Sequence, residues 1–330
     1  MQLGLTIQNM ESKRNVFILV CFIVLLLLMF GYSYRPLRSI QIKKSEAMND
    51  NNLYLVPTED IIEKMDNDTI YLLFDKYVVQ NQFYCSNLLR QGPWNASGKT
   101  ICADDSFKPS SPCILYSFGS KLDFAFEEAS WKSFGCEIHT FDPSLPIVQS
   151  RIPVFVNYHL IGLSGRDFVQ TEPEVWRHHD LPLRKTWEMQ RLSSIRKSLS
   201  HTDKLIDILK IDIEGWEWDV LSDILQTGAF NNVKQLCLEV HFGFSFKHVI
   251  KEEKLQLKFT KNTWGNVSMK DQIKLLLRLF NAGFRITAKQ SFDWGSVHVK
   301  NKQISTLVEL TLVNINLLNK ISLFSSAKDV

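Results

Sequence analysis

The sequence carries almost no net charge. Its 330 residues include 38 Lys and Arg against 35 Asp and Glu, which leaves a formal charge of +3. Nucleic-acid-binding domains usually concentrate basic residues in a patch or stripe, and no block of like charges occurs here. We therefore expect no nucleic-acid partner. The chain also lacks internal repeats and low-complexity tracts, which excludes repeat architectures and predicts an ordinary globular domain.

Several catalytic signatures are missing as well. The sequence has neither the Gly-x-Ser-x-Gly elbow of serine hydrolases nor the P-loop that cradles nucleotide phosphates. Its 8 histidines do not fall at the Cys and His spacing of zinc sites, so we predict no bound metal. The function has to be inferred from polar residues in other arrangements.

One uncharged apolar run stands apart from this composition, from Val16 to Phe30. Aromatic residues extend it to Tyr34, and about 17–20 apolar residues suffice to cross a bilayer. We expect a short tail over 1–15 and a transmembrane signal anchor over 16–34. A cleaved signal peptide is the alternative, because Lys13 and Arg14 resemble the basic region that begins one.

Sequence features point to a secretory compartment for the region after the anchor. Glycosylation sequons begin at Asn67, Asn95 and Asn266. Basic residues flank the apolar run on both sides, but long domains translocate largely regardless of flanking charge. We predict a single-pass type II membrane glycoprotein of the Golgi or another secretory lumen, with secretion as the alternative.

The cysteines fit an oxidising compartment. Cys85 and Cys102 bracket a segment rich in Gly, Pro, Asn and Ser, where a disulfide would close the loop. Their spacing leaves two free thiols as the alternative. Cys136 and Cys237 lie in apolar, strand-like runs, and we expect both to be buried thiols.

Strand and helix patterns alternate along most of the chain. A polar stem over 35–57 precedes an extension over 58–109 with one helical pattern and a loop-rich end. From 110 to 330 the alternation predicts a Rossmann-like, doubly wound α/β sheet with a C-terminal antiparallel strand pair. The expected strands lie at 113–119, 136–143, 154–162, 205–213 and 233–242, and the expected helices at 124–135, 187–199, 216–225 and 271–283.

Two strand ends carry residues suited to a nucleoside. Gly119 ends the first strand, where a glycine lets the backbone turn closely around a ligand. Asp142 ends the second, where a carboxylate is placed to accept hydrogen bonds from ribose hydroxyls. The alternative is an acid that caps the next helix. Together the two residues favour an adenosine-type ligand.

Acids follow the next two strands. Asp212 and Glu214 come at the end of the strand that begins near Leu205, and Glu239 and His241 end the following one. In a doubly wound sheet these ends meet at the ligand crevice. We predict Asp212, Glu214, Glu239 and His241 as catalytic residues, with His241 as the base. Asp212 and Glu214 could instead form a metal-binding pair or begin a capped helix.

The order of these motifs is similar to that of a known family. YSFG, GCEIHTFDPS, GLSGRD, DILKIDIEGWEW and LEVHF together resemble the methyltransferase-like protein 24 family over residues 83–315, and LKIDIEG also resembles FkbM-type methyltransferases. The resemblance implies a class I methyltransferase fold and S-adenosylmethionine (SAM) as cofactor. It implies cofactor contacts at Gly119 and Asp142, and active-site placement of Asp212 and Glu214. From its place at the strand end, we also expect Asp212 to contact the cofactor. Lys121 departs from the family pattern, which often has a second glycine there.

These observations lead to one expected function and two alternatives. We expect SAM-dependent methylation of a hydroxyl, with a luminal glycan or protein as the acceptor. A non-catalytic luminal binding protein is the first alternative, because Lys121 could crowd the cofactor. A metal-dependent glycosyltransferase is the second, because of the anchor and the Asp212-x-Glu214 pair.

Overall fold

The structure is a computed structural model, and it describes residues 57–171, 173, 181–251, 254–261, 267–292 and 295–318. The chain divides between Leu55 and Val56, and all the described residues belong to the second unit. The predicted tail, the anchor over 16–34, the stem up to residue 56 and the sequon asparagine Asn266 lie outside them. No helix in the described part of the chain is long and apolar enough to cross a membrane.

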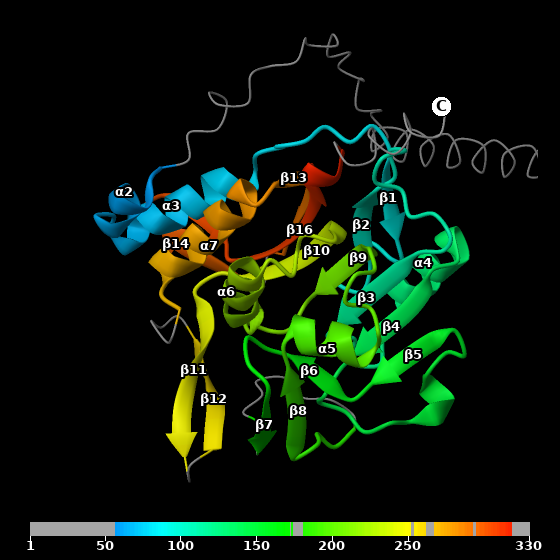
Figure 1. Cartoon of the computed structure of the whole chain (residues 1–330). Coiled ribbons are helices and arrows are strands. Elements are labelled where there is room, and N and C mark those ends of the chain that lie inside the picture. The colour runs from blue at the N-terminus through cyan, green and yellow to red at the C-terminus, as the bar shows by residue number, and fades with distance from the viewer. Residues whose placement is uncertain are drawn as a thin grey trace, which may run out of the picture. The chain divides into compact units, whose positions relative to one another are not determined.

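A seven-stranded sheet forms the centre of the fold (Figure 1). Its order is β13-β16-β10-β9-β3-β4-β5. The strands are β3 (Ile114–Phe118), β4 (Glu137–Phe141), β5 (Val156–His159), β9 (Ile206–Ile211), β10 (Val233–His241), β13 (Phe284–Ser291) and β16 (Leu307–Asn314).

The strand directions confirm the expected mixed α/β sheet. Strands β5, β4, β3, β9 and β10 are parallel and follow the 3-2-1-4-5 order of a doubly wound fold. The last strand, β16, pairs antiparallel with both β10 and β13, as predicted for the C-terminal pair. This architecture is consistent with the methyltransferase fold that the resemblance implies.

The side chains of alternate strand residues pack into two apolar layers, one on each face of the sheet. Tyr116 and Leu209 pack with the helices of one face, and Leu115 and Ile208 pack with the other. The first face is covered by α2 (Glu59–Glu63), α3 (Asn67–Val78), α5 (Leu192–Ser198), α6 (Glu217–Thr227) and α7 (Met269–Asn281). The second face is covered by α4 (Ala125–Phe134) and strand β2 (Lys99–Cys102).

Local signals set the ends of several helices. Asp66 and Ser268 cap α3 and α7 by accepting hydrogen bonds from the backbone of Thr69 and Asp271. Gly135 takes a left-handed conformation directly after α4, and Gly228 does the same after α6. The predicted helices 124–135, 216–225 and 271–283 are thus confirmed within a few residues.

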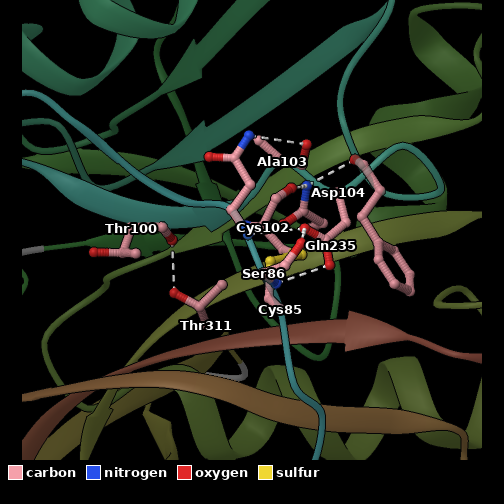
Figure 2. Close-up of a disulfide and its surroundings, with 10 residues drawn as sticks. Cys85, Ser86, Thr100, Cys102, Ala103, Asp104, Gln235 and Thr311 are labelled. Atoms are coloured by element: carbon pink, nitrogen blue, oxygen red, sulfur yellow. Dashed lines mark hydrogen bonds between the residues drawn. A yellow bond between two sulfur atoms is a disulfide. The ribbon is translucent and has the colours of Figure 1, made fainter. Parts of the chain in front are cut away.

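The extension before the sheet is more ordered than its loop-like sequence indicates. Strands β1 (Leu88–Gln91) and β2 form an antiparallel hairpin that lies on the sheet. The predicted disulfide between Cys85 and Cys102 is present at the end of β2 (Figure 2). The Gln235 side chain accepts a hydrogen bond from the Cys102 amide and donates one to the Cys102 carbonyl. The Thr311 hydroxyl donates to the carbonyl of Thr100. These contacts fix β2 across β10 and β16.

A second disulfide corrects the expectation for Cys136, which bonds Cys113 and is not a free thiol. The reason is the parallel pairing of β3 with β4. Ile114 is in register with Glu137, so the cysteines just before these residues lie side by side, with their Cα atoms 4.6 Å apart. Cys237 is a buried free thiol, as predicted.

The predicted helix over 187–199 is wrong in its first half. Residues Thr186–Gln190 form strand β8, and only Leu192–Ser198 are helical. In β8, Trp187 and Met189 alternate with exposed residues, which is the pattern of a strand. Strand β8 lies between β6 (Ile161–Leu163) and β7 (Phe168–Thr171) in a small separate sheet. The predicted strand 154–162 is therefore two strands, because β5 belongs to the central sheet and β6 to this small one.

Two hairpins and one short helix complete the described fold. They are β11 (Phe244–Lys251) with β12 (Lys254–Lys261), β14 (Ser296–Val299) with β15 (Lys302–Ser305), and a 3-10 turn over Gln149–Arg151. Strand β12 lies beside β7, so the two outlying sheets adjoin each other below α6 in the view of Figure 1.

Candidate active site

The four predicted catalytic residues come together at the carboxyl ends of β9 and β10. His241 Nε2 lies 3.4 Å from Glu214 Oε2 and 3.9 Å from Glu239 Oε1. Asp212 and Glu239 both contact the ammonium of Lys99, at 3.3 and 3.2 Å. We call these five residues the crevice cluster. The cluster lies beside the switch point between β3 and β9, where doubly wound sheets bind their ligands.

Gly119 is required by the close approach of two loops. Its φ is +83°, and a Cβ atom there would lie 1.7 Å from the carbonyl oxygen of Asp212. Lys210 reinforces the contact, because its ammonium donates to the carbonyl oxygens of Phe118 and Gly119 at 3.1 and 2.9 Å. The glycine predicted to contact a cofactor therefore also joins the first loop to the loop that carries Asp212.

Lys121 extends from the first loop to the crevice cluster. Its φ of +51° is in the left-handed region that favours glycine, which agrees with the glycine expected at this position. The Lys121 ammonium forms an ion pair with Glu214, whose side chain is 20% exposed. A lysine in this conformation costs on the order of 1 kcal/mol relative to an unstrained backbone.

Asp142, which follows the neighbouring strand β4, forms hydrogen bonds that hold the loop after β3 in place. One carboxylate oxygen accepts a hydrogen bond from the Lys121 backbone at 2.7 Å, and the other accepts from the Ser144 backbone at 2.9 Å. The side chain is buried. These bonds hold together the loops after β3 and β4. The predicted contact of Asp142 with ribose hydroxyls stays a prediction.

Lys99 provides the positive centre of the crevice cluster. The fully buried ammonium lies 2.9 Å from Glu309 Oε2, in addition to its contacts with Asp212 and Glu239. The other Glu309 oxygen lies 3.2 Å from Arg90 Nη1. Both cations belong to the β1–β2 hairpin, so the extension before the sheet contributes directly to the site.

Nearby cations keep the two partly exposed acids ionised. Burial alone would raise the pKa of Asp212, but Lys99 and Lys210 outweigh it and hold the pKa below its usual range. Burial likewise opposes ionisation of Glu214, yet the hydrogen bond with His241 and the charge of Lys121 lower its pKa to about 2. Both carboxylates are therefore charged at neutral pH.

The pKa values of Glu239 and His241, which are both buried, shift the other way. Burial and the adjacent charge of Asp212 raise the pKa of Glu239 to about 7. Burial disfavours the charged form of His241, but Glu217 and Glu214 raise its pKa well above the ordinary 6.5. His241 consequently carries a proton at neutral pH, which argues against its predicted role as the base.

The alternative of a metal-binding pair at Asp212 and Glu214 finds no support. Among the described residues, the groups of His, Cys, Asp and Glu close enough to share an ion include neither acid. Both carboxylates instead have lysine partners, Lys99 and Lys121. Cations supplied by the chain already neutralise these two acids.

A family model described as a methyltransferase domain matches residues 37–272. The chain belongs to this methyltransferase family. "Probable methyltransferase-like protein 24" of Homo sapiens and that of Rattus norvegicus are each 26% identical to it over 230 residues. The match covers 66% of this chain and 58% or 59% of the relatives, so the chain spans less than two thirds of their length. The likeness to methyltransferase-like protein 24 indicated by the motifs is confirmed.

Solved structures give only distant likenesses to this chain. The crystal structure of the methyltransferase FkbM from Methylobacillus flagellatus has a TM-score of 0.34 and 11% identity, covering 76% of this chain and 57% of that one. The glycopeptide N-methyltransferase MtfA, complexed with sinefungin, has a TM-score of 0.24 and 6% identity, covering 61% and 80%. At these scores neither carries an argument about the chemistry.

Sequence reasoning misses three residues in and around the crevice cluster: Lys99, Glu309 and Glu217. Glu217 Oε1 lies 3.1 Å from His241 Nδ1 and accepts a hydrogen bond from the Ile213 backbone at 2.9 Å. Glu217 lies in the first turn of α6, where an acidic residue is common, so the sequence does not indicate a role in the site. Lys99 and Glu309 come from segments that meet the strand ends only in the folded chain.

Proposed function

We propose that this protein transfers a methyl group from SAM to a hydroxyl oxygen. The observation that carries the proposal is the crevice cluster, which holds ionised carboxylates beside a glycine turn at the switch point of a methyltransferase-family domain. These groups suit the cofactor, because SAM presents sulfonium and ammonium cations to its site. Gly119, Asp142 and Asp212 would hold it, and it would supply an electrophilic methyl group.

The carboxyl pair of Asp212 and Glu239 is the best candidate for the base. The Asp212 side chain is 16% exposed, so it can contact an acceptor, whereas Glu239 is buried behind it. Both carboxyl groups contact the Lys99 ammonium, and the pKa of Glu239 is about 7, close to the value that favours general-base catalysis. A proton leaving the acceptor hydroxyl can pass by way of Asp212 to Glu239, which has the higher pKa of the two.

His241 has a positioning role in this proposal. Its protonated ring lies between Glu217 and Glu214, 3.1 and 3.4 Å away. A fixed positive charge there keeps Glu214 ionised and oriented toward the crevice. Glu214 is then available to bind a cationic or hydroxyl group of the substrates.

Cofactor binding is the first test of the proposal. Calorimetry on the full-length protein should show binding of S-adenosylhomocysteine, and a ligand at about 100 times its Kd should stabilise the fold by about 2.7 kcal/mol. Asp212→Asn should weaken binding or lower methyl transfer by roughly 10²–10⁴, as expected for loss of a general base. Asp60→Asn, an exposed acid on α2, is the matched control and should change neither quantity.

Absence of binding at millimolar S-adenosylhomocysteine would contradict the enzymatic proposal. The Lys121–Glu214 ion pair favours the second candidate function in that case, a binding protein whose crevice no longer admits the cofactor. Lys121→Gly distinguishes the two, because restored binding would identify the lysine side chain and its strained backbone as the obstacle.

We further propose that the acceptor is a luminal glycan or protein hydroxyl and that residues 16–34 anchor the protein in a secretory membrane. Two disulfides and the exposure of the sequon residues Asn67 and Asn95 support an oxidising compartment. Endoglycosidase treatment should lower the apparent mass, and Asn95→Gln should reduce the shift. An unglycosylated protein open to protease from the cytosolic side of vesicles would contradict this location.

A further inference from the structure

A second polar cluster lies away from the crevice. Glu137, His139 and His201 each place one possible ligand atom within 4.8 Å of the others. Glu137 begins β4 and His139 follows it in the same strand, whereas His201 lies between α5 and β9. With His159 of β5, which contacts His139, we call these residues the histidine cluster.

The ligand atoms are close to the spacing that one metal ion needs. Glu137 Oε1 lies 2.8 Å from His139 Nε2 and 4.0 Å from His201 Nε2. Zinc bonds of about 2.0–2.1 Å at a tetrahedral angle place neighbouring ligand atoms about 3.4 Å apart. The Glu137 side chain is 49% exposed, so a small rotation of its carboxylate is enough to reach this geometry.

The other nitrogen of each ring is already held by a neighbour. His139 Nδ1 lies 3.0 Å from His159 Nε2, and His201 Nδ1 lies 2.7 Å from the hydroxyl of Tyr116. The Nε2 atoms of both histidines are left facing the same carboxylate. Proteins orient metal-binding histidines in this way, with a hydrogen bond at the nitrogen opposite the metal.

The charge of the cluster also suits a cation. The Glu137 carboxylate places a negative charge beside the two imidazole rings, which favours a bound cation. Lys204 and Arg196 oppose a cation. Arg196, however, donates to surrounding backbone carbonyls, and Lys204 is exposed to solvent that screens its charge.

We propose that Glu137, His139 Nε2 and His201 Nε2 bind a divalent transition-metal ion, with zinc as the best match. Two imidazoles and one carboxylate are a zinc ligand set that leaves a fourth position for water. Because the Glu137 side chain is 49% exposed, water can reach the site. The ion would join β4 to the turn before β9 and is independent of the proposed methyl transfer.

The other group of possible ligands in the described chain does not compete with this one. Cys85, Cys102 and Asp104 also lie close together, but the two cysteines form a disulfide and offer no thiolate. Asp104 accepts hydrogen bonds from the Ser86 and Asn87 backbone and serves to close the loop (Figure 2).

Metal titration of the full-length protein tests the proposal. After treatment with a chelator, the protein should take up one equivalent of zinc, and cobalt(II) in its place should give the absorption of a four-coordinate nitrogen and oxygen site. Glu137→Gln should lower zinc affinity by at least roughly 10-fold, as loss of a ligand should cost no less than loss of an outer-shell partner. Because Glu137 is exposed, this variant should fold normally. Glu128→Gln, an equally exposed acid on α4, is the matched control and should bind zinc unchanged.

A second variant separates metal binding from simple packing. Tyr116→Phe keeps the buried ring and removes only the hydroxyl that faces His201, so zinc affinity should fall by about 10-fold or more. Unfolding of the metal-free variant provides the structural control. Zinc affinity that is unchanged in both Glu137→Gln and Tyr116→Phe would overturn the proposal, as would failure of the unaltered protein to bind zinc at micromolar concentration.

Discussion

The crevice cluster and the histidine cluster lie on the same sheet but handle charge in opposite ways. At the carboxyl ends of the strands, Lys99 alone contacts three carboxylates, and every acid of the cluster has a cationic partner. Near the start of β4, the imidazole rings of His139 and His201 lie beside a single half-exposed carboxylate. The first cluster supplies its own cations, whereas the second can accept one from solution. The comparison shows that spatial grouping of titratable residues does not by itself define a metal site.

The largest effect is expected from removing the shared cation of the crevice. Lys99→Met leaves Asp212, Glu239 and Glu309 buried around an apolar side chain, and loss of one partner of a buried ion pair costs about 3–5 kcal/mol. Urea unfolding measures the loss. Lys132→Met is the control. The Lys132 side chain is 63% exposed, and its ion pair with Glu128 should contribute less than about 0.5 kcal/mol to stability. A loss below 1 kcal/mol for Lys99→Met would show that the acids do not depend on this cation.

Acid should affect His159 and Glu214 in different pH ranges. Glu239, whose raised pKa of about 7 adds stability as pH falls, titrates in the same range as His159. The pKa of His159 is lowered from 6.5 to about 4, so its contribution to stability is present above pH 6.5 and is lost as pH falls toward 4. The pKa of Glu214 is lowered from 4.5 to about 2, so its contribution is lost only below pH 4.5. Between pH 7 and 4.5 we expect a loss of about 2 kcal/mol from His159, after allowance for its partial exposure.

The variant His159→Gln checks this assignment. Unfolding with urea at several pH values under metal-free conditions compares the two proteins. The advantage of the unaltered protein over the variant in unfolding free energy should be about 2 kcal/mol smaller at pH 4.5 than at pH 7. The profile below pH 4.5 should be unchanged. An equally steep fall in both proteins above pH 4.5 would assign the titration to other groups.

The smallest effect is expected from the exposed cation of the crevice. Lys121→Met removes the ion pair with Glu214 but leaves the backbone unchanged, and a partly exposed pair contributes no more than about 1 kcal/mol. The same urea experiment compares Lys121→Met directly with Lys99→Met. A loss above 2 kcal/mol would mean that Lys121 is as important to the fold as the buried lysine.

Residues that follow strands directly were predictable from the sequence. Asp212 and Glu239 come at the ends of apolar, alternating segments, and the rule for doubly wound sheets brings those ends together. The same rule located Gly119 beside them. The local hydrophobic pattern and one topological rule were sufficient to locate these residues. Each of them lies within a few positions of a strand that the surrounding sequence itself predicts.

Residues placed by long-range packing were not predictable in this way. The position of Lys99 depends on a short hairpin that the sequence presents as a loop, held to the sheet by Gln235 and Thr311. The pairing of Cys113 with Cys136 depends on the register of two parallel strands. Motif spacing finds ligands that are close in sequence, so it could not join His201 to β4.

The contact between Gly119 and the Asp212 carbonyl also limits how this molecule can be altered. Because there is no room for even a methyl group between them, the two loops should move together as one unit. Changes made in both loops will not have additive effects. Redesign of the crevice would therefore have to begin from elements outside this pair of loops, where a shift in one segment need not displace Asp212.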